Sequence, residues 1–122
     1  MTKKITGIKI LSAGVMLMGV VHDAATFTPL ISGKLALLED GAKNAFTYFS
    51  LMCGILLILG GAFVYVLSDK LTEHTFLRKP FNLALFALVL DGILAVSYMT
   101  HNPFAWIVFV LTIALQLLCA KP

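Results

Sequence analysis

Two histidines and two aspartates lie within or directly beside the long apolar stretches of this sequence. Asp91 stands about halfway along the stretch 81–99. His22 and Asp23 end the first stretch, and His101 follows the third. An ionisable group at depth in a membrane usually faces protein or water, because contact with lipid is costly. Asp91 is therefore a candidate proton or cation site or a contact for a ligand. The alternative is a hydrogen-bonded aspartate that fixes helix packing.

A polar stripe is predicted to run from Asp91 along one face of its helix. The positions four and seven residues on, Ala95 and Tyr98, share that face and lead towards His101 and Asn102. If the first and third helices are parallel, the histidines lie at a similar depth on one side of the membrane. The candidate ligand or proton site comprises His22, Asp23, Asp91, Tyr98 and His101.

Metal binding and catalysis would both depend on His22. Together with His101 on another helix it would be able to ligate a haem iron or a metal, although metal sites normally have three or four ligands. The alternative is that both histidines bond to carbonyls or headgroups, so we expect no cofactor. An enzyme acting on lipids or quinones would need a general base near a nucleophile. The adjacent pair His22 and Asp23 diverges by about 100° on a helix, which favours a non-catalytic protein without deciding the question.

The composition indicates which solvent surrounds the chain. Of its 122 residues, 60% are hydrophobic and only 12% are charged. Soluble domains carry about 25% charged residues, so this chain has too little polar surface for water and the lipid bilayer is its expected partner. The nine basic residues are spread along the chain without a basic patch interleaved with aromatics. Nucleic acid is therefore not an expected partner.

Four apolar stretches predict an all-α integral membrane four-helix bundle that forms a single domain over residues 1–122. Each stretch meets the length of about 20 residues that a membrane helix needs. The first carries Lys9, whose long stem would let its ammonium reach the headgroups. It lacks a clear cleavage site, so we interpret it as a membrane helix and not as a signal peptide. The predicted helices cover residues 5–27, 45–67, 81–99 and 104–120.

The distribution of basic residues predicts the orientation. With the N-terminus inside, the inside segments carry seven Lys or Arg residues and the outside loops carry two. This bias predicts a multi-pass protein of the plasma (inner) membrane with both termini cytoplasmic. The inside residues are Lys3, Lys4, Lys9, Lys70, Arg78, Lys79 and Lys121, and the outside ones are Lys34 and Lys43.

The first outer loop contains too many leucines for a solvated segment. Ser32 is predicted to cap a short helix that carries Leu35 and Leu38 and ends near Gly41. We expect this short helix to lie on the outer interface or to fold back over the bundle mouth. In the next helix, Ser50-x-x-x-Gly54 places two small residues one turn apart, which permits close contact between helices.

Two short motifs carry a resemblance to a known family. They are Gly19-Val20-Val21-His22 at the end of the first helix and Leu38-Glu39-Asp40-Gly41-Ala42-Lys43-Asn44-Ala45 before the second. With them the chain resembles an uncharacterised bacterial family of small four-helix membrane proteins, a domain of unknown function. The resemblance implies architecture and no activity. His22, Asp40, Gly41 and Asn44 match that pattern, whereas Asp91 and His101 are not part of it.

Two functions remain open from the sequence. The first is a non-catalytic membrane protein, an accessory subunit or partner-binding module of a membrane complex, since polar residues are few and small-residue faces invite other membrane subunits or self-association. The alternative is a binder or carrier of a small apolar ligand, an ion, or a haem or metal through the outward-facing His and Asp cluster. Co-purifying partners, or a visible absorption spectrum, would discriminate between them.

Overall fold

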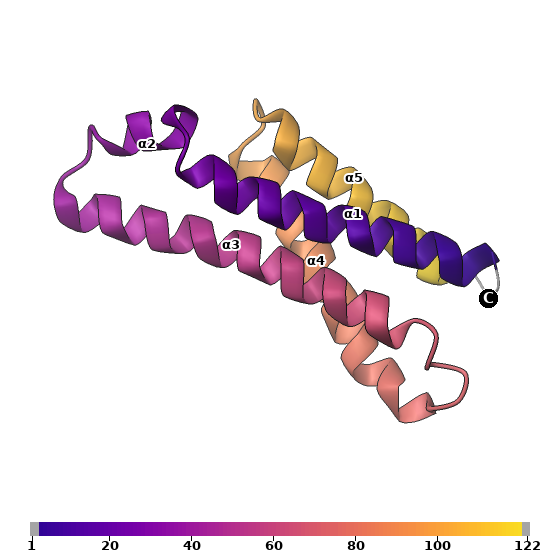
Figure 1. Ribbon diagram of the computed structural model, residues 1–122. Coiled ribbons are helices and arrows are strands. Elements are labelled where there is room, and N and C mark those ends of the chain that lie inside the picture. The colour runs from indigo at the N-terminus through magenta and orange to yellow at the C-terminus, as the bar shows by residue number, and fades with distance from the viewer. Residues whose placement is uncertain (1–2, 121–122) are drawn as a thin grey trace.

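The computed structural model describes residues 3–120 of the protein, which are almost entirely helical (Figure 1). Within that range, four helical segments are long and apolar enough to cross a membrane, with mean hydropathies from 1.6 to 2.3. The prediction of an all-α fold with four helices suited to crossing a membrane is therefore confirmed. The elements are α1 (Lys3–Thr26), α2 (Pro29–Leu35), α3 (Asp40–Leu67), a 3₁₀ turn (Thr75–Leu77), α4 (Arg78–Tyr98) and α5 (Pro103–Ala120).

Two of the long helices begin earlier than the apolar pattern predicts. α3 begins at Asp40 and not at Ala45, and α4 begins at Arg78 and not at Phe81. Polar residues mark the end of the apolar span, but they do not interrupt a helix that continues into the aqueous phase. An acidic residue in the first turn, such as Asp40, even stabilises it through the helix dipole.

Three prolines mark helix starts. Pro29, Pro80 and Pro103 each stand within the first turn of a helix, where the missing N–H is tolerated. The predicted start of the short helix in the first outer loop was wrong because of Pro29. Because its fixed φ favours the first helical position, α2 begins there and contains Ser32 in its interior instead of at its cap. Leu38 consequently lies beyond α2, and Gly41 lies in the first turn of α3.

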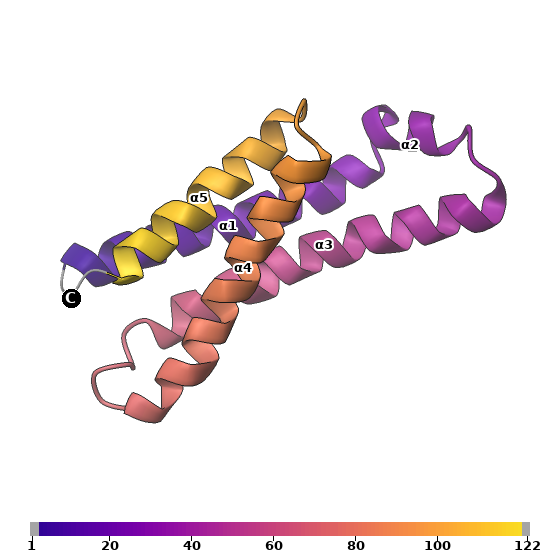
Figure 2. The same cartoon turned by 180° about the vertical axis from the view of Figure 1, so that it is seen from behind.

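The long helices form a ring of four contacts. α1 packs against α3 and α5, and α4 packs against the same two helices. Successive long helices run in opposite directions, so every packed pair is antiparallel (Figures 1 and 2). The start of α1, the turn after α3 and the end of α5 lie at one end of the bundle, with α2 and the α4–α5 turn towards the other.

The core is a narrow seam on each helix. Buried positions recur at alternating spacings of three and four residues, which is the pattern of helices that cross at about +20°. Most large apolar side chains outside the seam are exposed, as expected for a surface that faces lipid. The seam residues are Ile8, Ser12, Val15, Gly19 and Thr26 in α1; Gly54, Leu57, Gly61 and Val64 in α3; Phe81, Leu85, Leu88 and Gly92 in α4; and Ala105, Val108, Thr112 and Leu115 in α5.

Small residues bring the backbones of α1 and α3 together. A Cβ atom added at Gly19 would lie 2.6 Å from the carbonyl oxygen of Gly54, and one at Gly61 would lie 2.9 Å from that of Ser12. A side chain at either position would therefore separate the two helices. The close approach predicted from Ser50-x-x-x-Gly54 is confirmed at Gly54.

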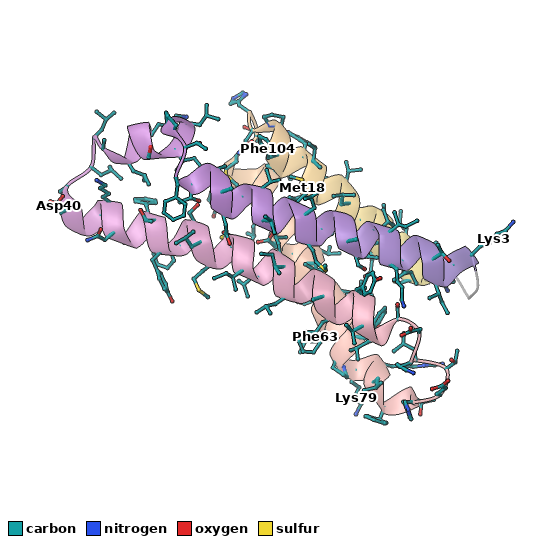
Figure 3. All side chains as sticks on the ribbon, in the orientation of Figure 1. Lys3, Met18, Asp40, Phe63, Lys79 and Phe104 are labelled. Carbon is teal, nitrogen blue, oxygen red and sulfur yellow. The ribbon has the colours of Figure 1, made fainter. Side chains whose placement is uncertain are left out.

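An ion pair joins α1 to the turn after α3. Lys9 Nζ donates a hydrogen bond to Asp69 Oδ2 at 2.8 Å and lies 5.1 Å from the centre of the Tyr65 ring. This hydrogen bond holds the pKa of the Asp69 carboxyl below its usual range, so the carboxylate stays charged. The structure thus gives Lys9 a protein partner where the sequence predicted the lipid headgroups. Side chains across the molecule are drawn in Figure 3.

Candidate functional site

A polar cluster joins the last turns of α1 to α3. Ser50 Oγ lies 2.7 Å from Thr26 Oγ1 and 3.3 Å from His22 Nε2. Thr26 also donates a hydrogen bond to the backbone carbonyl of His22, at 3.1 Å. His22 and Thr26 are four residues apart and so share the face of α1 that meets α3. The Ser50 hydroxyl therefore contacts the imidazole between the helices, and the Thr26 hydroxyl contacts Ser50.

Asp23 adds a carboxyl group beside this cluster. Its Oδ1 atom is buried, and within residues 3–120 it has no hydrogen-bond partner. The carboxyl group lies against the backbone of α3 at Gly54, where any Cβ atom would overlap it. More than about 90% of buried polar groups in proteins have a partner. An orphaned carboxyl oxygen between two helices is thus the most unusual polar feature of the site.

Asp91 approaches the cluster from α4. It is partly buried and interacts electrostatically with His22. Cys53, on α3, lies near both Asp23 and Asp91. Three helices that are far apart in sequence therefore bring one imidazole and two carboxyl groups to a common region. We call the set of His22, Asp23, Thr26, Ser50 and Asp91 the polar centre.

The other two candidate residues lie apart from the polar centre. Tyr98 is 86% exposed, and His101 is exposed in the turn between α4 and α5. Within the described part of the chain, no hydrogen bond or ion pair connects either residue to the polar centre. The reason is the packing of α4. Its last buried residue is Gly92, so the end of the helix that carries Tyr98 is not covered by its neighbours.

A metal site is not evident from the geometry. Among residues 3–120 there is no group of three or more His, Cys, Asp or Glu side chains arranged to hold a metal ion. A haem or metal held by His22 and His101 alone stays a prediction, which an absorption spectrum and metal analysis would test.

Sequence reasoning missed two members of the polar centre. Ser50 and Thr26 were not candidate site residues, although Ser50 contacts the His22 ring and Thr26 contacts Ser50. Two signals were present. His22-x-x-x-Thr26 places an imidazole and a hydroxyl on one helix face, and the predicted close contact at Ser50-x-x-x-Gly54 brings the Ser50 hydroxyl to that face.

No protein-family model, curated protein or solved structure matches the chain. The resemblance to the uncharacterised four-helix family therefore stays a prediction. The four apolar helices are consistent with it at the level of architecture.

Proposed function

We propose that this protein is a non-catalytic integral membrane protein that takes up a proton at its polar centre. The observation that carries the proposal is the buried, unpartnered Oδ1 atom of Asp23, next to the backbone of α3. An isolated carboxylate is costly in a medium of low dielectric constant unless it is neutralised or paired with a cation. A proton on this carboxyl group would remove that cost.

The residues near Asp23 favour a proton, and not another cation, as the species that neutralises its carboxylate. Asp91 supplies a second carboxyl group from α4, near His22. His22 supplies an imidazole, a side chain that both accepts and donates protons in many proteins. Ser50 contacts its ring at 3.3 Å, and Thr26 holds the Ser50 hydroxyl in place at 2.7 Å. The set resembles the chains of Asp, Glu and His residues that move protons within membranes.

Infrared difference spectroscopy of the protein in lipid nanodiscs tests this proposal. Titration with pH is expected to reveal a carbonyl band of a protonated carboxyl group. The band is expected to weaken in Asp23→Asn, and the midpoint of its pH titration is expected to shift in Asp91→Asn. Asp40→Asn is the matched control, because Asp40 is exposed at the start of α3 and lies outside the polar centre. An unchanged band in both Asp23→Asn and Asp91→Asn would refute the proposal. A midpoint that follows sodium concentration would instead indicate an alkali cation.

Partner binding, as an accessory subunit of a membrane complex, is a second candidate that one feature favours. α1 ends at Thr26, beside Ser50, so within residues 3–120 the part of α3 from Asp40 to Phe49 has α2 as its one neighbouring helix. The 28 residues of α3 span about 42 Å at 1.5 Å per residue, against a hydrocarbon core of about 30 Å. The uncovered part of α3 exposes the aromatic side chains Phe46, Tyr48 and Phe49. A transmembrane helix of another chain would fit this aromatic face.

The proposed orientation has both termini in the cytoplasm of a cell whose plasma (inner) membrane holds the protein. Its support is the seven-to-two distribution of basic residues, in which Lys121 lies outside the described residues. In this orientation α2 lies along the outer interface. The exposed apolar side chain of Leu30 suits that position.

Two positions in the first part of α3 test the orientation and the partner. Lys43→Cys, in a chain with Cys53→Ser and Cys119→Ser, is expected to react with a membrane-impermeant maleimide added outside the cell, because Lys43 is exposed in the first turn of α3. A photo-crosslinker at Tyr48 is expected to join a second membrane chain in native membranes. Phe63 is the control position, because it is exposed but lies within the packed half of α3. Labelling only after the membrane is broken would contradict the orientation. Equal crosslinking at Tyr48 and Phe63 would contradict the partner.

A further inference from the structure

A cleft of about 960 Å³ opens at the end of the bundle where α1 begins. α4 and α5 meet at their connecting turn and diverge towards the opposite end (Figure 2). The cleft is lined by α4 and α5 on this diverging side, together with Lys4 of α1 and the turn after α3 at Leu71 and Thr72. It lies at the opposite end of the bundle from α2 and is lined by no residue of the polar centre.

The mouth of the cleft carries positive charge. Lys4 and Arg78 both line it, and no Asp or Glu is among its lining residues in the described chain. The two acids of the neighbouring turn have other partners. Asp69 pairs with Lys9 at 2.8 Å, and Glu73 lies 3.8 Å from Lys70. Arg78 is also the first residue of α4, where the helix dipole adds partial positive charge. The mouth is thus suited to an anion.

The wall of the cleft behind these charges is apolar. Phe81, Leu85, Phe86 and Val89 line it along α4, in a row that leads away from Arg78. From Arg78 to Val89 the helix rises about 16 Å at 1.5 Å per residue. This is about half of the 30 Å hydrocarbon core of a bilayer. The cleft therefore combines a cationic mouth with an apolar wall as long as one leaflet is thick.

We infer that this cleft binds an anionic phospholipid. The phosphate lies at the mouth beside Arg78, and the polar side chains of Asn82 and Gln116 are available to the headgroup. One acyl chain runs along the apolar wall towards Val89. Basic pockets between transmembrane helices are suited to anionic headgroups for the same electrostatic reason. The inference does not depend on the proposed proton uptake.

Native mass spectrometry of the delipidated full-length chain tests the inference. Phosphatidylglycerol is expected to bind more tightly than phosphatidylcholine with the same acyl chains. Arg78→Gln is expected to weaken phosphatidylglycerol binding about fivefold, since one basic side chain near an anionic headgroup contributes about 1 kcal/mol. Its effect on phosphatidylcholine is expected to stay within about twofold. Lys79→Gln is the matched control, because it removes the neighbouring positive charge from a residue that does not line the cleft.

A second variant tests the apolar wall. Val89→Trp is expected to lower the binding of both lipids several-fold, with a helical circular dichroism spectrum that shows the chain still folds. Equal losses in Arg78→Gln and Lys79→Gln, or equal affinities of the two lipids for the wild type, would overturn the inference. Displacement of phosphatidylglycerol by millimolar inorganic phosphate would also overturn it, because it would show a site for the free anion.

Discussion

Replacing Gly61 with alanine is expected to destabilise the protein by about 1–3 kcal/mol, the usual cost of overpacking a well-packed contact. The added Cβ would lie 2.7 Å from Met16 Cγ, 2.9 Å from the carbonyl oxygen of Ser12 and 3.2 Å from the Met16 amide nitrogen. A flexible side chain is able to move aside, but the backbone of α1 moves only if the whole helix shifts. The loss is expected despite the higher helix propensity of alanine, which favours it over glycine by about 1 kcal/mol.

Gly41→Ala is the matched control in the same helix. No atom lies within 4 Å of the position that its Cβ would take, so only the propensity effect remains. This variant is expected to be neutral or slightly stabilised. Reversible unfolding of both variants in mixed micelles measures the difference. Equal stability of Gly61→Ala and Gly41→Ala would show that α1 and α3 are not in backbone contact at this level.

The Gly54→Ala variant is expected to lose stability because its Cβ would overlap the carboxyl group of Asp23. The loss is again about 1–3 kcal/mol. Asp23→Ala removes that carboxyl group, so the double variant is expected to recover part of the loss. Recovery is incomplete, because the carbonyl oxygen of Gly19 would still lie 2.8 Å from the new Cβ.

A double-mutant cycle at Asp23 and Gly54 isolates this contact. The coupling between residues in direct contact is typically about 0.5–3 kcal/mol. Unfolding free energies of the wild type, the two single variants and the double variant supply the cycle. Strict additivity would mean that the Asp23 carboxyl group does not lie against α3, and the proposed proton site would then lose its central observation.

The positions of the spans were predictable because lipid imposes a simple requirement. A helix must be apolar over about 20 residues, and Pro29 and Pro103 mark the breaks in the sequence itself. The starts of α3 and α4 were not predictable from hydropathy, since a helix continues past the membrane surface without any change in its hydrogen bonds. The start of α2 was predicted at Ser32, a residue type that often caps helices. Pro29, three residues earlier, determined instead where α2 begins.

The polar centre was predictable only in part. Because an ionisable side chain at depth in a membrane is costly, Asp91, Asp23 and His22 were recognised as unusual from the sequence alone. The stripe through Tyr98 assumed that a helix face stays packed along its whole length, whereas α4 has no buried residue beyond Gly92. The partnership of Lys9 with Asp69 joins positions 60 residues apart. Hydropathy and spacing within one helix hold no information about such a pairing.

That separation has a consequence for how the protein is made. α1 has the lowest mean hydropathy of the four spans, 1.6, and carries the ammonium of Lys9. The ribosome must add 60 further residues, including all of α3, before Asp69 exists to meet that charge. Lys9 therefore gains its ion-pair partner only after α3 has been made, and the hairpin of α1 and α3 with the turn that follows is the smallest unit that holds both the close backbone contact and this ion pair.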